Sequence, residues 1–253
     1  MSAAVMASPS LAAQRGILGA VLLVAAWEGL ARGLDLPSYV LPAVSDILAS
    51  IWSNRMLLTQ AAGYTLFEAL AGYGVGCLIG IALAVVITML PPVRSVMLPI
   101  ATAINSVPVV GYSPLILLWF GIGVASKVVM VAMAVSFTVF LSTLAGFDRV
   151  DRRAVDLLRS FGAGRFKILF RLRLPTALPL MLTAMRVSTV RSVIVAIVTE
   201  MLGAYGGLGW IIYQAVLQID FVQVWSAIFV ASAISLTFFG LIGAIERRIL
   251  FWT

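Results

Sequence analysis

Three ionisable side chains, Arg186, Arg191 and Glu200, lie inside one long apolar segment of the chain. A charged group at the centre of a bilayer costs at least about 2.5–3.5 kcal/mol on insertion scales, so each of the three is expected to face protein or water. Arg191 lies deepest in the segment. We expect it to form a buried ion pair with an acid of another apolar segment, such as Glu68 or Glu28, and contact with a solute is the alternative. On a helix Arg191 points about 140° away from Arg186, so the two arginines cannot share one stripe.

Other reactive side chains are scarce. The chain contains no histidine, which excludes His-based general bases, His metal sites and Ser-His nucleophiles. The single cysteine, Cys77, can form neither an internal disulfide nor a multi-cysteine metal site. No G-x-x-x-x-G-K-[ST] phosphate loop occurs, so the chain has no recognisable means of hydrolysing ATP by itself. We therefore expect neither a catalytic residue nor a metal site.

The one long charge-rich stretch, residues 148–179, holds eight of the 17 Lys and Arg residues. Apolar residues recur at helical spacing on either side of Gly162. This pattern predicts two short amphipathic helices joined by a glycine turn, the second of them ending at Leu174–Pro175. A solvated basic loop or a patch for lipid headgroups is the alternative, but neither requires this order of helix, glycine, helix and proline.

The elements that carry these residues are predicted to be membrane-spanning helices. The chain is 62% apolar and only 11% charged, with a mean hydropathy of +1.11, whereas an ordinary soluble domain is about 45–50% apolar and roughly 25% charged. This excludes a soluble two-domain enzyme and a protein with one membrane anchor. Six apolar segments have near the 17–25 residues that a bilayer requires. We predict an all-α protein with a single transmembrane domain over residues 1–253 and spans at about 16–34, 65–90, 97–120, 126–147, 180–202 and 222–245.

The placement of basic residues predicts the orientation of these spans. If the N-terminus is cytoplasmic, twelve basic residues lie inside and three outside. The twelve are Arg15, Arg94, the eight in the 148–179 stretch, Arg247 and Arg248. Both termini and the charge-rich stretch are therefore expected on the cytoplasmic side. A signal-peptide core over residues 16–27, preceded by Arg15, is the alternative for the first span.

Two spans have unusual sequences. In the second span, Gly72, Gly76 and Gly80 lie four residues apart, on one helix face that another backbone can approach closely. We expect packing within the chain there, and a subunit contact is the alternative.

In the third span, Pro108 and Pro114 interrupt the helix. Such breaks occur in simple kinks and also where protein or a water-filled cavity satisfies the freed backbone groups, and both readings stay open here.

The 148–179 stretch resembles the EAA loop of ABC importer permeases. Its matching residues are Asp156 at the Glu position, Leu157 and Leu158 at the two alanines, Gly162 at the glycine, and Leu174–Pro175 at the closing pair. Three further stretches resemble the nitrate/sulfonate/taurine subgroup of these permeases, in the right order along the chain: residues 36–42, 114–127 and 185–209.

The resemblance implies a type I ABC importer permease in a bacterial cytoplasmic membrane. In that family two permease copies form the pathway, two ABC ATPase subunits bind inside, and a solute-binding protein delivers the solute outside. ATP and magnesium would be bound by the partner subunits, with no cofactor in this chain. Membrane lipid is the further expected partner, and nucleic acid is not. The residues implied to contact the ATPase are Asp156, Leu157, Leu158, Arg159, Ser160, Phe161, Gly162, Ala163, Leu174 and Pro175.

By the same resemblance, the third and fifth spans line the pathway. The polar candidates there are Asn105, Ser106, Arg186, Ser188, Arg191, Ser192 and Glu200. The subgroup implies a small anion such as a sulfonate, taurine or nitrate, with a vitamin precursor or an aromatic compound as the alternative. A secondary transporter also uses broken helices and intramembrane charges, but we find no convincing internal repeat, and the 148–179 stretch would have no role there.

Overall fold

The structure is a computed structural model that describes residues 9–250, with side chains from Gln14 onward. Every secondary-structure element in that range is helical. Five helices are long and apolar enough to cross a membrane, and a sixth span is possible if one bent helix pair is counted as a span. The five are α1 (Pro9–Gly33), α3 (Arg55–Met89), α6 (Val124–Asp148), α9 (Leu174–Leu202) and α11 (Phe221–Ile249). This confirms the predicted all-α class with several spans.

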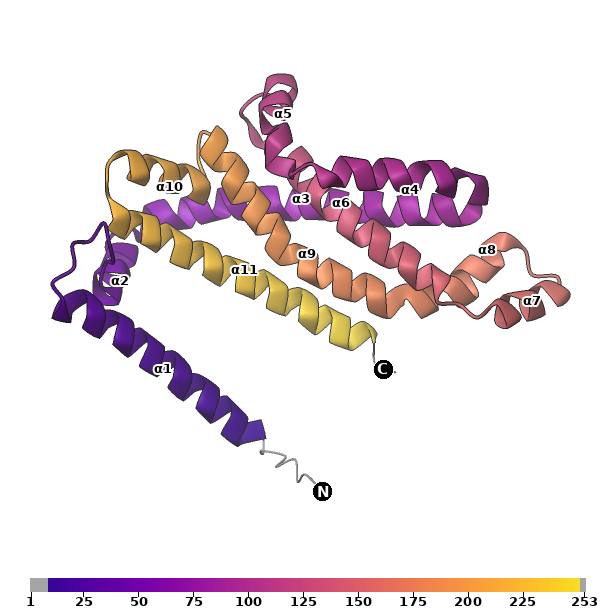
Figure 1. Ribbon diagram of the computed structural model, residues 1–253, viewed down its shortest axis with the longest axis horizontal. Coiled ribbons are helices and arrows are strands. Elements are labelled where there is room, and N and C mark those ends of the chain that lie inside the picture. The colour runs from indigo at the N-terminus through magenta and orange to yellow at the C-terminus, as the bar shows by residue number, and fades with distance from the viewer. Residues whose placement is uncertain (1–8, 251–253) are drawn as a thin grey trace.

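The long helices run side by side along the long axis of the molecule (Figure 1). α6 lies between α3 and α9 and packs extensively against both. The contact with α3 is close because a Cβ on Gly72, Gly76 or Gly80 would lie within 2.8 Å of an atom of α6. The glycine face of α3 is therefore occupied by another helix of the same chain.

The third apolar segment is broken. It consists of α4 (Pro91–Ser106), a single 3-10 turn (Val109–Tyr112) and α5 (Ser113–Phe120), and the two halves are bent by 85°. The break falls at Pro108, whose missing N–H ends the ladder of helical hydrogen bonds. A small cavity of about 150 Å³ lies beside the break, and Asn105 lines it together with residues of α6.

The charge-rich stretch forms a helical hairpin at one end of the molecule. α7 (Arg152–Ser160) is followed by a turn at Gly162 and then by α8 (Arg165–Ile168). The predicted end of the second helix at Leu174–Pro175 is wrong, because the chain is helical without interruption from Arg165 to Leu202. A π-helical turn over Leu169–Arg173 precedes α9, and the N–H of Leu174 donates to the carbonyl of Leu169, five residues back. This wider turn allows Pro175, which lacks an N–H, to lie inside a continuous helix.

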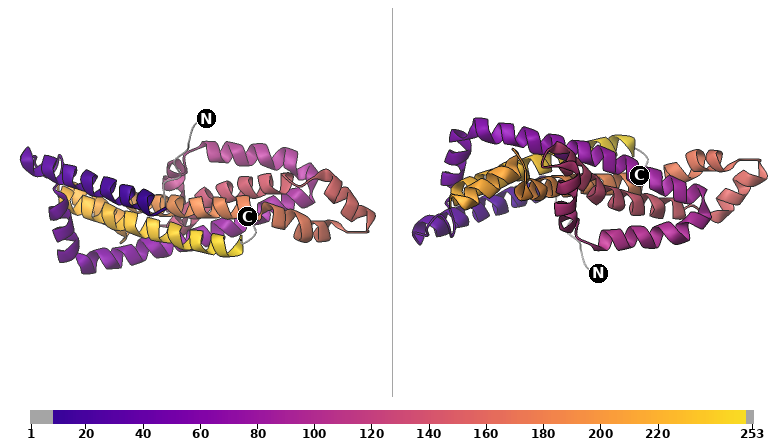
Figure 2. Two further views of the ribbon diagram at one scale, coloured as in Figure 1. Left: turned by 90° about the horizontal axis from the view of Figure 1, so that it is seen from below. Right: turned by 90° about the horizontal axis from the view of Figure 1, so that it is seen from above.

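The two ends of the molecule carry different short helices. α7 and α8 lie at one end, while α2 (Val44–Ser53) and α10 (Leu208–Leu217) lie at the other (Figures 1 and 2). α1 leaves the bundle and contacts it mainly near its C-terminal end, where the Trp27 ring lies 4.9 Å from that of Trp225. Most of its apolar side chains are exposed. In a membrane these side chains would contact lipid or another subunit.

Candidate coupling and transport sites

The α7 hairpin is held in shape by its own caps and a small core. The Asp151 side chain accepts a hydrogen bond of 2.9 Å from the backbone N–H of Arg153, which caps the start of α7. At the other end Gly162 has a φ of +73°, and the N–H of Ala163 donates to the carbonyl of Leu158 over 2.9 Å. This is the left-handed glycine cap that commonly ends a helix. Val155, Ala163 and Ile168 pack together inside the hairpin.

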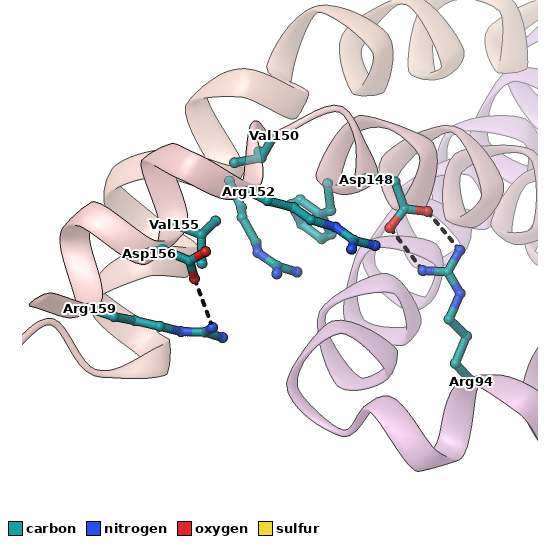
Figure 3. A pocket seen from close by; sticks show the side chains of 9 residues that line it. Arg94, Asp148, Val150, Arg152, Val155, Asp156 and Arg159 are labelled. Carbon is teal, nitrogen blue, oxygen red and sulfur yellow. Dashed lines mark hydrogen bonds and ion pairs between the residues drawn. The ribbon is translucent and has the colours of Figure 1, made fainter.

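The hairpin carries several exposed apolar side chains. Leu157 and Phe161 are 57% and 75% exposed, and Phe166 and Phe170 are similarly uncovered. Asp156 lies on the same helix and pairs with Arg159 over 3.3 Å (Figure 3). Large apolar side chains gathered on a surface typically mark an interaction site. Of the residues predicted to contact the ATPase, those of α7 and its turn lie together, whereas Leu174 and Pro175 are the first two residues of α9.

Arg191 does not form the predicted ion pair. It is exposed on α9, where its guanidinium donates to the Thr138 hydroxyl of α6 over 3.3 Å. Glu28 pairs with Arg32 instead, at 2.7 Å, and Glu68 lies beside Glu200. The reason is the rotation of α9, which places Ser188 and Ser192 in the interior and turns Arg191 outward.

Arg186 contacts α11. Its guanidinium lies 3.3 Å from the Glu246 carboxylate and 4.3 Å above the centre of the Phe239 ring. Thr183 donates to the other Glu246 oxygen over 3.0 Å. This arginine therefore links α9 to α11 within the chain.

The remaining polar candidates divide between the interior and the surface. Ser188 and Ser192 are fully buried inside this chain, so their placement gives no support to a position on the pathway. Ser106 is exposed and its hydroxyl donates to the carbonyl of Thr102. Asn105 is half-buried at the broken span.

Glu200 is part of a buried polar cluster at the end of the molecule opposite α7. One Glu200 oxygen accepts from the Thr65 hydroxyl over 2.7 Å, and the other accepts from the backbone N–H of Gly209 over 2.6 Å. The Thr65 hydroxyl oxygen in turn accepts from the N–H of Leu208 over 2.8 Å. A Cβ on Gly207, where φ is +102°, would overlap the Glu200 carboxylate. These contacts hold the start of α10 against α3 and α9.

Two further charged residues belong to this cluster: Lys127, which sequence reasoning missed, and Glu68, which it named only as a possible partner of Arg191. Lys127 is fully buried, donates to the carbonyls of Ile122 and Gly203, and interacts electrostatically with Glu68 and Glu200. Glu68 is 4% exposed and lies beside Glu200. Its place near the start of an apolar helix was the signal that could have revealed Lys127. A buried lysine requires nearby acids, because an isolated buried charge is strongly disfavoured.

The class of protein follows from these features together. The chain is a helical protein with several apolar spans, a broken span, and a charged helix–glycine–helix hairpin at one end. The family model for "binding-protein-dependent transport system inner membrane component" matches residues 76–251, and the chain belongs to this family. It is a multi-pass inner-membrane permease of an ABC importer, a transport component of the kind that works with ATPase and binding-protein partners.

Individual relatives support the assignment. The chain is 29% identical to the formylaminopyrimidine transport permease protein of Halalkalibacterium halodurans, over 92% of this chain and 93% of that protein. It is 30% identical to the taurine transport system permease protein of Escherichia coli, over 66% of this chain and 58% of that protein. Its fold is similar to that of a chain of the inward-facing MetNI methionine ABC transporter, with a TM-score of 0.69, 18% identity, and coverage of 78% of this chain and 98% of the other.

Proposed function

We propose that α7 and its Gly162 turn form the contact through which cytoplasmic ATPase subunits act on this permease. The observation that carries the proposal is the projecting hairpin, whose outer face presents exposed Leu157 and Phe161. The caps and the small core of the hairpin hold that face rigidly on α9, because α8 continues into α9 as one helix. A movement imposed on α7 would therefore be transmitted to α9 and the spans packed against it.

The proposal includes the orientation of the chain and a second copy of it. The hairpin and the cytoplasmic ends of α1 and α11 would lie inside, as the bias of basic residues favours; residues 1–8 and 251–253 lie outside the described part of the chain. Two copies would face each other across the solute pathway. Support comes from Arg191, which is exposed on a membrane-spanning helix and needs water or protein rather than lipid beside it.

The proposed solute is a small anion such as taurine or another sulfonate. A guanidinium on the pathway surface favours anions, and one relative is a taurine transport permease. A formylaminopyrimidine-like solute is the second candidate, because the relative of that name matches over nearly the whole chain. Uptake by cells that carry the transporter, measured for each solute with Arg191→Gln as the variant, separates the two. If the wild type takes up taurine and Arg191→Gln loses that uptake, the anion is supported. If the wild type takes up the formylaminopyrimidine and Arg191→Gln takes it up equally well, the second candidate is supported.

The coupling contact is tested by co-purification with the ATPase encoded beside this permease. Gly162→Val puts a β-branched residue at a positive φ and should abolish retention of the ATPase. Gly164→Val is the matched control, because Gly164 has a φ of −71° and a side chain there meets nothing within 4 Å. Equal retention by both variants would show that the hairpin is not the contact.

A further inference from the structure

A cavity of about 580 Å³ lies beside the α7 hairpin, between α7, the start of α4 and the end of α6 (Figure 3). Four guanidinium groups and two carboxylates line it. The charged residues are Arg94, Asp148, Arg152, Asp156, Arg159 and Arg173. The lining therefore carries an excess of positive charge.

Both carboxylates are already paired. Arg94 and Asp148 form a two-pronged ion pair, with nitrogen–oxygen distances of 2.8 and 2.7 Å, and Asp156 pairs with Arg159. Arg152 and Arg173 have no ion-pair partner among residues 14–250. Figure 3 shows the Arg152 side chain extending toward the Arg94–Asp148 pair. Two guanidiniums thus face one cavity with no acid to balance them.

The position of the cavity along the helices indicates what could balance the charge of Arg152 and Arg173. Asp148 is the last residue of α6, Arg94 lies in the first turn of α4, and Arg173 immediately precedes α9. Asp148 and Arg94 thus lie where α6 ends and α4 begins, whereas Arg173 lies in the π-helical turn inside the continuous helix Arg165–Leu202. In the proposed orientation, the end of α6 and the start of α4 would lie near the headgroups of the cytoplasmic leaflet. Arg152 belongs to α7, outside the spans, and lines the cavity from the side of the hairpin.

We propose that this cavity binds a phosphate-bearing anion, either the headgroup of an anionic phospholipid of the cytoplasmic leaflet or free phosphate. Guanidinium groups bind phosphate through paired hydrogen bonds. Basic pockets between membrane helices on the cytoplasmic side bind anionic headgroups, and ligand pockets commonly measure about 300–1,000 Å³. The inference rests on the proposed orientation of the hairpin. A bound anion would tie α7 to the ends of α4 and α9 and stiffen the hairpin that contacts the ATPase.

The test uses the intact permease–ATPase complex in nanodiscs of phosphatidylcholine with and without phosphatidylglycerol. Native mass spectrometry after release from the nanodiscs measures the phosphatidylglycerol retained, and a parallel titration in detergent with inorganic phosphate measures the free anion. The variant is Arg152→Gln with Arg173→Gln. The matched control is Lys167→Gln with Arg171→Gln, which removes the same charge from the same stretch but from exposed residues outside the cavity lining.

We expect the cavity variant to weaken anion binding by about tenfold or more, since each basic residue near an anionic surface contributes several-fold. The control should bind as the wild type does. A variant with lysine at both cavity positions, which keeps the charge but loses the planar fork, should retain part of the binding. Retention of phosphatidylglycerol identifies the lipid as the source, and binding of phosphate alone identifies the free anion.

Equal binding by the cavity variant and its control would overturn the proposal. Binding by the isolated permease that disappears when the ATPase is present would also overturn it, because the cavity would then receive a group of the ATPase. The amount of ATPase retained in each preparation is measured separately. Loss of anion binding with full ATPase retention therefore leaves the coupling proposal unaffected.

Discussion

Gly162 has a φ of +73°, and a Cβ on it would meet no atom within 4 Å. Replacing it with alanine therefore changes only the cost of the backbone conformation, which is about 1–2 kcal/mol for a residue with a Cβ. We predict that Gly162→Ala weakens binding of the ATPase by about fivefold or more, because part of the hairpin population leaves the bound shape. Titration of the purified permease with the ATPase measures this. Gly164→Ala should bind as the wild type does, and an equal loss in both would contradict the role of the turn.

Glu200 is the buried acid with the most contacts, because both of its oxygens accept hydrogen bonds and Lys127 lies nearby. A glutamine there would turn an NH2 group toward one of the two donors and leave the lysine with less opposing charge. We predict that Glu200→Gln lowers the free energy of unfolding by about 3 kcal/mol. Thermal unfolding in detergent measures the change. Glu28→Gln, which breaks an ion pair near the surface, should cost less than Glu200→Gln, and the opposite ranking would be evidence against the cluster.

Sequence reasoning identified some residues correctly and missed others for a physical reason. The charged stretch showed its apolar periodicity because it lies in water, where polar and apolar faces differ. α9 is apolar almost all round, so its sequence could not indicate that Ser188 turns inward and Arg191 outward. The buried cluster joins Glu68, Lys127 and Glu200 from three helices. A local sequence pattern cannot predict a contact between residues so far apart in the chain.

At the scale of elements, the tight packing of α3 on α6 organises the bundle. A Cβ on Gly76 would lie 2.8 Å from the Ala132 carbonyl oxygen and from the Val135 Cβ, while a Cβ on Gly74 meets nothing within 4 Å. We predict that Gly76→Ala forces the helices apart and costs about 1–3 kcal/mol. Gly74→Ala should be neutral or slightly stabilising, since alanine favours helix. Unfolding midpoints of the two variants in detergent test this, and a Gly76→Ala protein as stable as Gly74→Ala would contradict the close packing.

Element boundaries were predictable where the chain changes from apolar to polar, and less so within helices. α3 begins at Arg55, about ten residues before the predicted span, because a helix can extend beyond the bilayer. Pro175 was taken as a helix end, but the wider π-helical turn before it accommodates a residue that has no N–H to donate, and the helix continues. The break at Pro108 was foreseen, but the 85° bend between the two halves was not.

For the whole molecule, the proposed orientation can be measured because the single cysteine, Cys77, is buried. We predict that Ser38→Cys reacts with a membrane-impermeant maleimide when applied from outside the cytoplasmic membrane, since this exposed residue lies in the outer loop after α1. Ser160→Cys on α7, in permease produced without its ATPase, should react only after the membrane is opened. Unmodified protein is the control and should not react. Labelling of Ser160→Cys in sealed cells would reverse the orientation.

The central claim is that ATP-driven import depends on the α7 hairpin, and uptake by proteoliposomes tests it most directly. The permease is reconstituted with its ATPase and binding protein, and accumulation of labelled solute is followed with and without ATP. We predict ATP-dependent uptake by the wild type and by Gly164→Val, and no uptake above background by Gly162→Val, although that variant inserts in equal amount. Uptake by Gly162→Val at the wild-type rate, or uptake by the permease without the ATPase, would contradict the account.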